Sequence, residues 1–227
     1  MFVDSDDWVT PNFCERAFEV IKDQQADVVL FDFYAINQSK MWIQAEHDDT
    51  VEALSKDDAM RYLVDKIGNI VWNKIYSTEL FQNISFPTGR CYEDIGTLCF
   101  VIEKANKICY LNQALYYYYY RGGSISKNPG KKEIEDRVRM LYRQYQFMKE
   151  HYYRIKDEVY FRALNTAMRF LVCFGMPQDQ SFKEIVDQII KLCRFADWKK
   201  LSKKRKLICK MYRVSPKMVE IPLLLLK

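Results

Sequence analysis

Residues 26–34 restrict the fold of this chain more than any other segment, because they read Ala-Asp-Val-Val-Leu-Phe-Asp-Phe-Tyr. A short run this rich in β-branched and aromatic side chains predicts a strand that is buried mostly on both faces. Such a strand must be covered on both sides, so we expect an α/β fold. With 227 residues, of which 49% are hydrophobic, the chain is long enough to build the core that this strand needs.

Apolar side chains at helical spacing surround this strand, and Thr10 and Ser55 are expected to cap the first two helices. A run that alternates tyrosines with aliphatic residues follows later and indicates further strands. We expect these elements, in order: helices at residues 10–22 and 55–68, helical turns at 71–81, a helix at 93–104, and two strands joined by a turn within 108–121.

From residue 131 the pattern is helical almost to the end of the chain. The four expected helices span residues 131–151, 154–174, 180–194 and 197–213. Residues 122–130 are the one stretch that resembles a linker, so we divide the chain into residues 1–127 and 128–227. Charge changes along the chain as well, since residues 1–100 carry 8 basic and 18 acidic side chains and residues 101–227 carry 27 and 12.

Several classes of chemistry are excluded by missing motifs. The chain has two histidines and no H-E-x-x-H, and it lacks the glycine-rich and serine motifs of nucleotide-binding loops and hydrolases. Its seven cysteines form no C-x-x-C pair, which favours reduced thiols and a cytoplasmic location. We expect neither a signal peptide nor a transmembrane helix. What remains is carboxylate chemistry.

The segment Asp4-Ser5-Asp6-Asp7 is the first candidate site. It follows two apolar residues, as if a buried strand ended there, and on a strand Asp4 and Asp6 would project from the same face. Two carboxylates on one face suit Mg²⁺ or Mn²⁺, which prefer oxygen ligands. The alternative is that these residues only form turns ahead of the first helix. A calcium EF-hand is disfavoured, because its glycine and closing glutamate are missing.

A second pair of acids, Glu93 and Asp94, lies at the expected start of the helix at 93–104. A carboxylate there can be held by backbone N–H groups and the helix dipole. It would act as a general base if it lay within about 3 Å of an acceptor hydroxyl. Simple capping of the helix is the alternative.

Aromatic and basic side chains form a third set of candidates. Trp72, Lys74 and the tyrosines of residues 116–120 offer flat faces and donors of the kind that bind sugars, although core packing explains them equally well. Arg121 precedes two glycines and would reach a phosphate, unless it merely ends a hairpin.

Residues 197–213 carry eight basic side chains with apolar residues at helical spacing. This pattern suits contact with an anionic membrane surface. A solvated basic helix packed on its neighbours is the alternative. Nucleic acid is not expected as a partner, because no known binding module accompanies the charge.

Motifs spread over residues 1–127 together resemble those of family 2 glycosyltransferases of the GT-A fold. Their order and spacing carry the resemblance, since each motif alone is weak. They are Phe2-Val3-Asp4-Ser5-Asp6-Asp7-Trp8, Trp72-Asn73-Lys74-Ile75-Tyr76, Glu79-Leu80-Phe81, Phe86-Pro87, Tyr92-Glu93-Asp94, Tyr118-Tyr119-Tyr120-Arg121 and Gly123-Ser124-Ile125.

The resemblance implies an inverting hexosyltransferase that moves a sugar from a nucleotide-diphosphate donor to a hydroxyl of a glycan or lipid-linked acceptor. By this analogy Asp4 and Asp6 form a D-x-D motif that binds Mg²⁺ or Mn²⁺ and the donor, with Arg121 nearby, while Trp72 and Lys74 line the acceptor side. Asp94, with Glu93 beside it, corresponds to the catalytic base. The family's usual setting implies surface polysaccharide synthesis at the inner face of the membrane.

The sequence departs from this family in one respect. Members begin with a nucleotide-binding half that carries Pro-x-Tyr-Asn and Asp-Gly-Ser, and neither motif occurs here. We therefore expect a partial, Rossmann-like GT-A mixed sheet with an exposed apolar edge and a mostly helical C-terminal extension. We expect a truncated enzyme that keeps the residues for the metal and the base but lacks the nucleotide-binding half.

Two alternatives to a glycosyltransferase stay open. The first is a non-catalytic remnant that acts as an interaction or membrane-apposing module. The second is a glycoside hydrolase that uses Asp6 and Asp94 about 5–10 Å apart. The clustering of acids at residues 4–7 makes the hydrolase less attractive, because it suggests a cation site.

Overall fold

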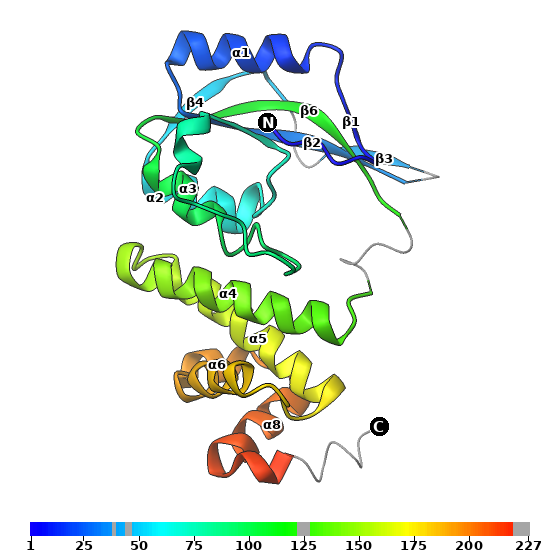
Figure 1. The fold of residues 1–227 in the computed structure, drawn as a ribbon, viewed down its shortest axis with the longest axis vertical. Coiled ribbons are helices and arrows are strands. Elements are labelled where there is room, and N and C mark those ends of the chain that lie inside the picture. Colours follow the sequence, from blue (N-terminus) through cyan, green and yellow to red (C-terminus); the bar gives the residue numbers. More distant parts are fainter. Residues whose placement is uncertain (38–39, 44–46, 122–127, 220–227) are drawn as a thin grey trace. The chain divides into compact units, whose positions relative to one another are not determined.

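The computed structural model of this protein describes residues 1–37, 40–43, 47–121 and 128–219 (Figure 1). The Gly123-Ser124-Ile125 motif therefore lies outside the described residues. Two compact units divide the chain: the first unit comprises Met1–Pro87 and Thr97–Asn128, and the second comprises Thr88–Gly96 and Pro129–Lys227. The sequence places the division between residues 127 and 128, whereas the structure groups residues 88–96 with the helical second unit.

A mixed sheet forms the centre of the first unit. Two long parallel strands, β2 (Val28–Ile36) and β6 (Ile108–Tyr119), lie side by side. Shorter antiparallel strands extend the sheet on both sides: β1 (Trp8–Val9) and β4 (Val51–Leu54) pair with β6, and β3 (Met41–Ile43) and β5 (Lys74–Tyr76) pair with β2. The first five residues of β2 are buried, which confirms the strand expected from the aromatic and β-branched run.

Helices cover both faces of this sheet, as Figure 1 shows. Helix α1 (Phe13–Gln24) lies on one face, where Phe13 packs edge-on against Phe31 of β2 with ring centroids 5.5 Å apart. On the other face lie α2 (Lys56–Arg61), which continues into a π-helical turn at Tyr62–Lys66, and α3 (Leu98–Lys104). A 3₁₀ turn spans Thr78–Phe81. Because both faces are covered, the apolar residues Val28–Phe31 at the start of β2 are all buried.

The second unit is helical, as the periodicity predicts. Its helices are α4 (Lys131–His151), α5 (Lys156–Phe174), α6 (Gln180–Lys191), α7 (Phe195–Lys200) and α8 (Lys203–Val214), followed by a 3₁₀ turn at Pro216–Val219. The single helix expected at residues 197–213 is wrong. Leu201 is extended and the Ser202 hydroxyl caps α8 by accepting from the Arg205 N–H, so a new helix begins there.

The segment before β1 differs from its expectation. Residues 1–7 are not a strand, and Phe2 and Val3 are 37% and 50% exposed. Pairing with β6 begins only at Trp8, which faces Tyr117. The acids instead form a turn in which the Asp7 N–H donates to the Asp4 carbonyl at 3.2 Å.

Three further expectations about elements are wrong. Residues 108–119 are one strand rather than two, because the turn-like residues near Asn112 are absorbed by a shift in the β2–β6 register. Residues 74–76 form β5, whose pairing with β2 overrides the helical spacing. The helix expected at residue 93 begins at Leu98.

Two details of α1 also differ. Asn12 rather than Thr10 occupies the cap position, and not every apolar side chain of the helix is buried, since Phe18 is 66% exposed. Among the described residues, no helix is long and apolar enough to cross a membrane.

Candidate functional site

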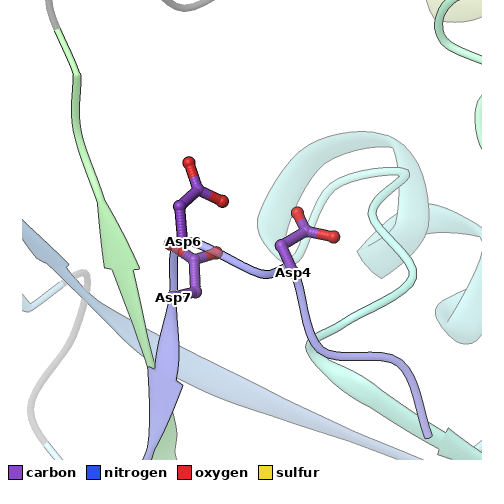
Figure 2. Close-up of side chains that lie close together, drawn as sticks. All are labelled: Asp4, Asp6 and Asp7. Atoms are coloured by element: carbon purple, nitrogen blue, oxygen red, sulfur yellow. The ribbon is translucent and has the colours of Figure 1, made fainter.

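The acids of residues 4–7 converge on one point. Asp4, Asp6 and Asp7, which we call the acidic triad, each place a carboxylate oxygen within 4.8 Å of the others. Figure 2 shows the three side chains, which lie close together. All three come from the turn that leads into β1. The expectation that Asp4 and Asp6 lie together holds, but a turn brings them together rather than a strand.

Tyr116 of β6 fastens this turn to the sheet. Its hydroxyl accepts a hydrogen bond from the Asp4 N–H at 3.0 Å and donates one to the Asp7 carboxylate at 2.9 Å. Tyr116 is fully buried, so this hydroxyl cannot move without repacking the core. Sequence reasoning treated it only as one tyrosine in a run, and nothing local marks it as a partner of residues more than a hundred positions away.

Asp7 has a different role from the other two acids. Its second oxygen accepts a hydrogen bond from the Tyr119 N–H at 2.8 Å, so both oxygens are bonded within the protein. Burial raises the pKa of the Asp7 carboxyl above its usual range, although these hydrogen bonds oppose the shift. Asp4 and Asp6 are exposed, which leaves them the better placed pair for a ligand from solvent.

Arg121 is brought to the acidic triad at the end of β6. Its guanidinium Nε lies 3.3 Å from a carboxylate oxygen of Asp6, and both side chains are partly exposed. A surface ion pair of this kind contributes little stability. It does place a cationic, fork-shaped donor beside the carboxylates, where it would meet an anionic ligand held by them.

The donor set of the acidic triad fits a hard cation. Mg²⁺ and Mn²⁺ prefer carboxylate oxygens, and Mg²⁺ usually needs only one or two carboxylates because waters and substrate phosphates complete its shell. Asp4 and Asp6 offer that pair, with Asp7 within reach. The alternative expectation, in which these acids only form a turn, describes the backbone correctly but does not explain three converging carboxylates.

The two residues expected on the acceptor side belong to the core. Trp72 is 6% exposed and stacks on Tyr116, with centroids 4.2 Å apart. Lys74 is fully buried, and its ammonium donates to the carbonyl oxygens of Gly68 and Ile70 at 3.0 and 2.7 Å. A lysine held in this way supports the chain fold, so we leave Lys74 out of the site.

Glu93 and Asp94 lie in the second unit, in the turn that precedes α3. One oxygen of Asp94 accepts from the Ile95 N–H at 2.8 Å, a local contact and not the helix cap expected from the sequence. Both acids are half buried. The structure thus brings Asp4, Asp6 and Arg121 together in the first unit and assigns the two candidate bases to the other.

A buried acid that the sequence did not reveal holds the segment before Asp94 in place. Asp136 of α4 is fully buried, accepts from the Arg90 guanidinium at 2.8 Å, and accepts from the Cys91 N–H at 3.1 Å. These charged hydrogen bonds join residues 88–96 to α4. The sequence does hold one signal for this contact. Asp136 lies among the apolar positions of an amphipathic helix, and a charge buried there needs a partner.

The basic residues of 197–213 lie on α7 and α8. The apolar residues Ile208, Cys209 and Tyr212 of α8 are buried within the second unit. They are therefore not available for insertion into a bilayer. The exposed side chains of α8 are mostly basic, together with the apolar Leu207 and Val214, which are 52% and 71% exposed.

Comparison with known proteins gives this geometry a context. Residues 1–91 match the model of glycosyl transferase family 2. The chain is 29% identical over 135 residues to the glycosyltransferase GlyA of Streptococcus pneumoniae, covering 56% of this chain and 19% of that protein. It is 30% identical over 137 residues to GlyG of the same species, covering 55% and 44%.

A third relative is the putative glycosyltransferase EpsH of Bacillus subtilis, with 25% identity over 182 residues, covering 73% of this chain and 49% of that protein. The chain thus spans less than half the length of each of these three relatives.

Solved structures share the fold. The chain is similar to S. aureus TarS 1–349 in complex with UDP-GlcNAc, with a TM-score of 0.63, 19% identity, and coverage of 97% of this chain and 65% of that one. The complex of TarS 1–349 with UDP gives a TM-score of 0.58. This likeness confirms the expected mixed α/β, GT-A-like fold.

Proposed function

Because this chain is related to the family 2 glycosyltransferases through residues 1–91, we propose that it transfers a sugar from a nucleotide-diphosphate donor to a hydroxyl acceptor, with inversion. The convergence of the acidic triad within 4.8 Å supports this proposal more than any other single observation. We propose a hexosyl donor, and a glycan or lipid-linked acceptor in surface polysaccharide synthesis.

Asp4 and Asp6 would hold Mg²⁺ or Mn²⁺ in this function. The ion would supply charge neutralisation for the diphosphate leaving group. Arg121, at 3.3 Å from Asp6, would turn its guanidinium from that carboxylate to a diphosphate oxygen. Tyr116 and Asp7 would keep the turn in the shape that aligns the two ligands.

Asp94 is the proposed general base, with Glu93 beside it. Inversion at the anomeric carbon requires that the acceptor hydroxyl lose its proton on the face opposite the leaving diphosphate. A half-buried carboxylate suits this task, because it is shielded from bulk water yet open to a substrate. The contacts of Asp136 with Arg90 and Cys91 would keep the segment in position for it.

The nature of the donor is suggested by the solved relatives. The TarS structures carry UDP-GlcNAc or UDP, so we propose a uridine diphosphate sugar as the first donor to test. This chain lacks the Pro-x-Tyr-Asn and Asp-Gly-Ser motifs, and its contacts with the donor are therefore proposed only for the cation and the diphosphate.

The core positions of Trp72 and Lys74, which were expected on the acceptor side, favour a second candidate, a non-catalytic module that keeps the fold without transferring a sugar. Calorimetry with Mn²⁺ and UDP separates the two. The glycosyltransferase should bind UDP only when Mn²⁺ is present. A non-catalytic module should bind UDP poorly under both conditions, and a glycoside hydrolase should ignore both ligands.

Two substitutions test the assigned roles. Asp6→Ala should weaken Mn²⁺-dependent UDP binding by about tenfold or more, because it removes a charged ligand. Asp94→Asn should abolish UDP release in the presence of donor and acceptor while leaving UDP affinity nearly unchanged. Asp23→Ala, which removes an exposed acid from α1, is the matched control and should change neither. Full activity of Asp94→Asn would remove the base assignment.

A further inference from the structure

A small cavity within the second unit gathers three arginines. It has a volume of about 170 Å³ and lies among residues of α4, α5 and α8. Arg137 comes from α4, Arg169 from α5 and Arg205 from α8. Asn165 and Thr166 of α5 add neutral polar groups to its wall. The cavity thus brings together three positively charged side chains from three helices. Their mutual repulsion makes this arrangement unfavourable unless an anion compensates it.

These arginines lack acidic partners in the part of the chain that the structure describes. Arg205 donates to the Asn165 side-chain oxygen at 2.5 Å, and neither Arg137 nor Arg169 pairs with a carboxylate there. The Nε of Arg137 is buried and has no hydrogen-bond acceptor. A buried charged donor without an acceptor is costly, so the folded protein keeps a site that an added anion would complete.

The cavity is connected to the segment that carries the proposed base. The Arg137 guanidinium lies 5.3 Å from the ring centre of Tyr92, two residues before Asp94. The Tyr92 hydroxyl is also buried without a hydrogen-bond partner, and its backbone adopts φ +59°, which a tyrosine rarely does. Such a conformation persists only where the surrounding packing holds it, and the Tyr92 ring lies against Arg137, the arginine of α4 that lines the cavity.

We propose that this cavity binds a phosphate group. Guanidinium groups bind phosphate oxygens through paired, charged hydrogen bonds, and three of them offset the charge of one phosphate. The volume fits a tetrahedral oxyanion with part of its ester substituent, and it is too small for a sugar nucleotide. Arg169 is exposed and Arg205 is half buried, but an uncharged sugar would leave the buried Arg137 Nε without a charged acceptor.

The phosphate belongs to the acceptor, an assignment that rests on the proposed transfer function. Tyr92 and Asp94 lie in one segment of the second unit, and the cavity lies in the same unit. A phosphate held by the three arginines would position an acceptor that carries its hydroxyl toward this segment. The substrate class is therefore a phosphate-bearing acceptor, either a phosphodiester-linked glycan or a lipid-linked phosphate.

Calorimetric titration of the full chain with inorganic phosphate tests the site itself. Phosphate should bind without Mn²⁺ or UDP, and matched sodium chloride should not compete at equal ionic strength. Arg137→Gln and Arg169→Gln should each weaken binding by about tenfold or more. Lys149→Gln, an exposed change on α4 that removes the same charge, should leave binding unaltered. Circular dichroism shows whether each variant is folded.

Equal weakening in Lys149→Gln and in the arginine variants would overturn the proposal, because binding would then follow net charge. Failure of inorganic phosphate to bind the folded parent chain would overturn it as well.

Two further probes identify the source of the phosphate. Glycerophosphoglycerol represents a glycan phosphodiester, and vesicles with phosphatidic acid represent a lipid phosphate. If either probe competes with inorganic phosphate, the result supports the site. If neither probe competes, the result overturns the proposal.

Transfer kinetics then separate this inference from the proposed function. Arg137→Gln should raise the KM for a phosphate-bearing acceptor with kcat nearly unchanged. Phosphate binding without any transfer would leave the site intact and refute the transferase. Transfer with an unchanged KM in the variant would refute the assignment of the phosphate to the acceptor.

Discussion

Tyr116 decides the geometry of the proposed cation site through one buried hydroxyl. It links the backbone of Asp4 to the side chain of Asp7. Because it donates to one group and accepts from the other, it fixes the turn at two points. Because Tyr116 belongs to the rigid sheet, these two hydrogen bonds also restrict the turn at residues 4–7, which has no regular secondary structure.

The pKa of Asp7 has a consequence for stability. Burial raises the pKa of its carboxyl above the usual 3.8. An acid whose folded-state pKa is raised favours the folded protein below the unfolded pKa, and this contribution is lost as pH rises through the folded pKa. At neutral pH the Asp7 charge therefore opposes folding, and a cation bound at the acidic triad would offset that cost.

Removing the Tyr116 hydroxyl should loosen the proposed site without unfolding the chain. Tyr116→Phe leaves the Asp4 N–H and one Asp7 oxygen without their partner, so we expect a loss of about 1–3 kcal/mol in the free energy of unfolding. Calorimetry should show weaker Mn²⁺ binding, and urea unfolding should show the stability loss. Tyr117→Phe is the matched control, because the Tyr117 ring is half buried and stacks on Trp8. An unchanged Mn²⁺ affinity in Tyr116→Phe would contradict the positioning role.

At the scale of elements, single side chains decide where helices of the second unit begin. Asp179 caps α6 by accepting from the Phe182 N–H at 2.7 Å. It also accepts from the Ser181 hydroxyl and from the Arg139 guanidinium of α4. The Ser181 hydrogen bond, followed by the Phe182 N–H and Arg139, lowers the pKa of the Asp179 carboxyl to about 2. One carboxylate therefore both starts α6 and ties it to α4.

The contribution of Asp179 should depend on pH in one direction. Its folded-state pKa is lowered from 3.8 to about 2, so the stability it contributes is present above pH 3.8 and is lost as pH falls toward 2. Asp179→Ala should lower the urea midpoint of unfolding at pH 7, and the difference from the parent should shrink between pH 4 and about pH 2.

Urea titrations at several pH values measure this difference. Gln178→Ala, an exposed change one residue earlier, should leave the midpoint unchanged at every pH. A difference that grew on acidification would show that Asp179 does not act through its charged form.

At the scale of the whole molecule, charge is divided along the chain. Residues 1–100 have a net charge of −10 and residues 101–227 a net charge of +15. Arg137, Arg169 and Arg205, which line the cavity of the second unit, account for part of this positive charge. Many of the other basic residues lie on α7 and α8. Ile208, Cys209 and Tyr212 of α8 are buried, and basic residues outnumber the exposed apolar Leu207 and Val214, so we expect charge to dominate the contacts of this surface.

Binding to anionic vesicles should therefore be electrostatic. The full chain should sediment with phosphatidylserine vesicles at low salt and be released at about 0.5 M salt, because surface charges are then screened. The variant K203Q/K204Q/K210Q, which removes exposed charges from α8, should bind less. K149Q/K183Q/K191Q removes three charges from α4 and α6 and is the control for net charge. Binding that survives high salt would contradict an electrostatic contact.

Much of the fold could be predicted from sequence, because spacing along the chain decides which side chains face the core. The buried strand near Phe31, the capped helix after Ser55 and the helices from Lys131 onward follow that rule and are confirmed. The errors arise where a partner far away overrides local spacing. Residues 74–76 became a strand because β2 lies beside them, and residues 108–119 stayed one strand because β2 accommodates their irregularity.

The sequence by itself determined the family resemblance, the nearness of Asp4 and Asp6 and the helical character of the second unit, because each depends on residues that are close along the chain. Only the tertiary structure decided what holds the acidic triad, what fixes the segment of Asp94 and where three arginines converge. Tyr116 lies 112 residues from Asp4, and Asp136 lies 46 from Arg90. Contacts over such separations form only when the whole core packs, so no local pattern encodes them.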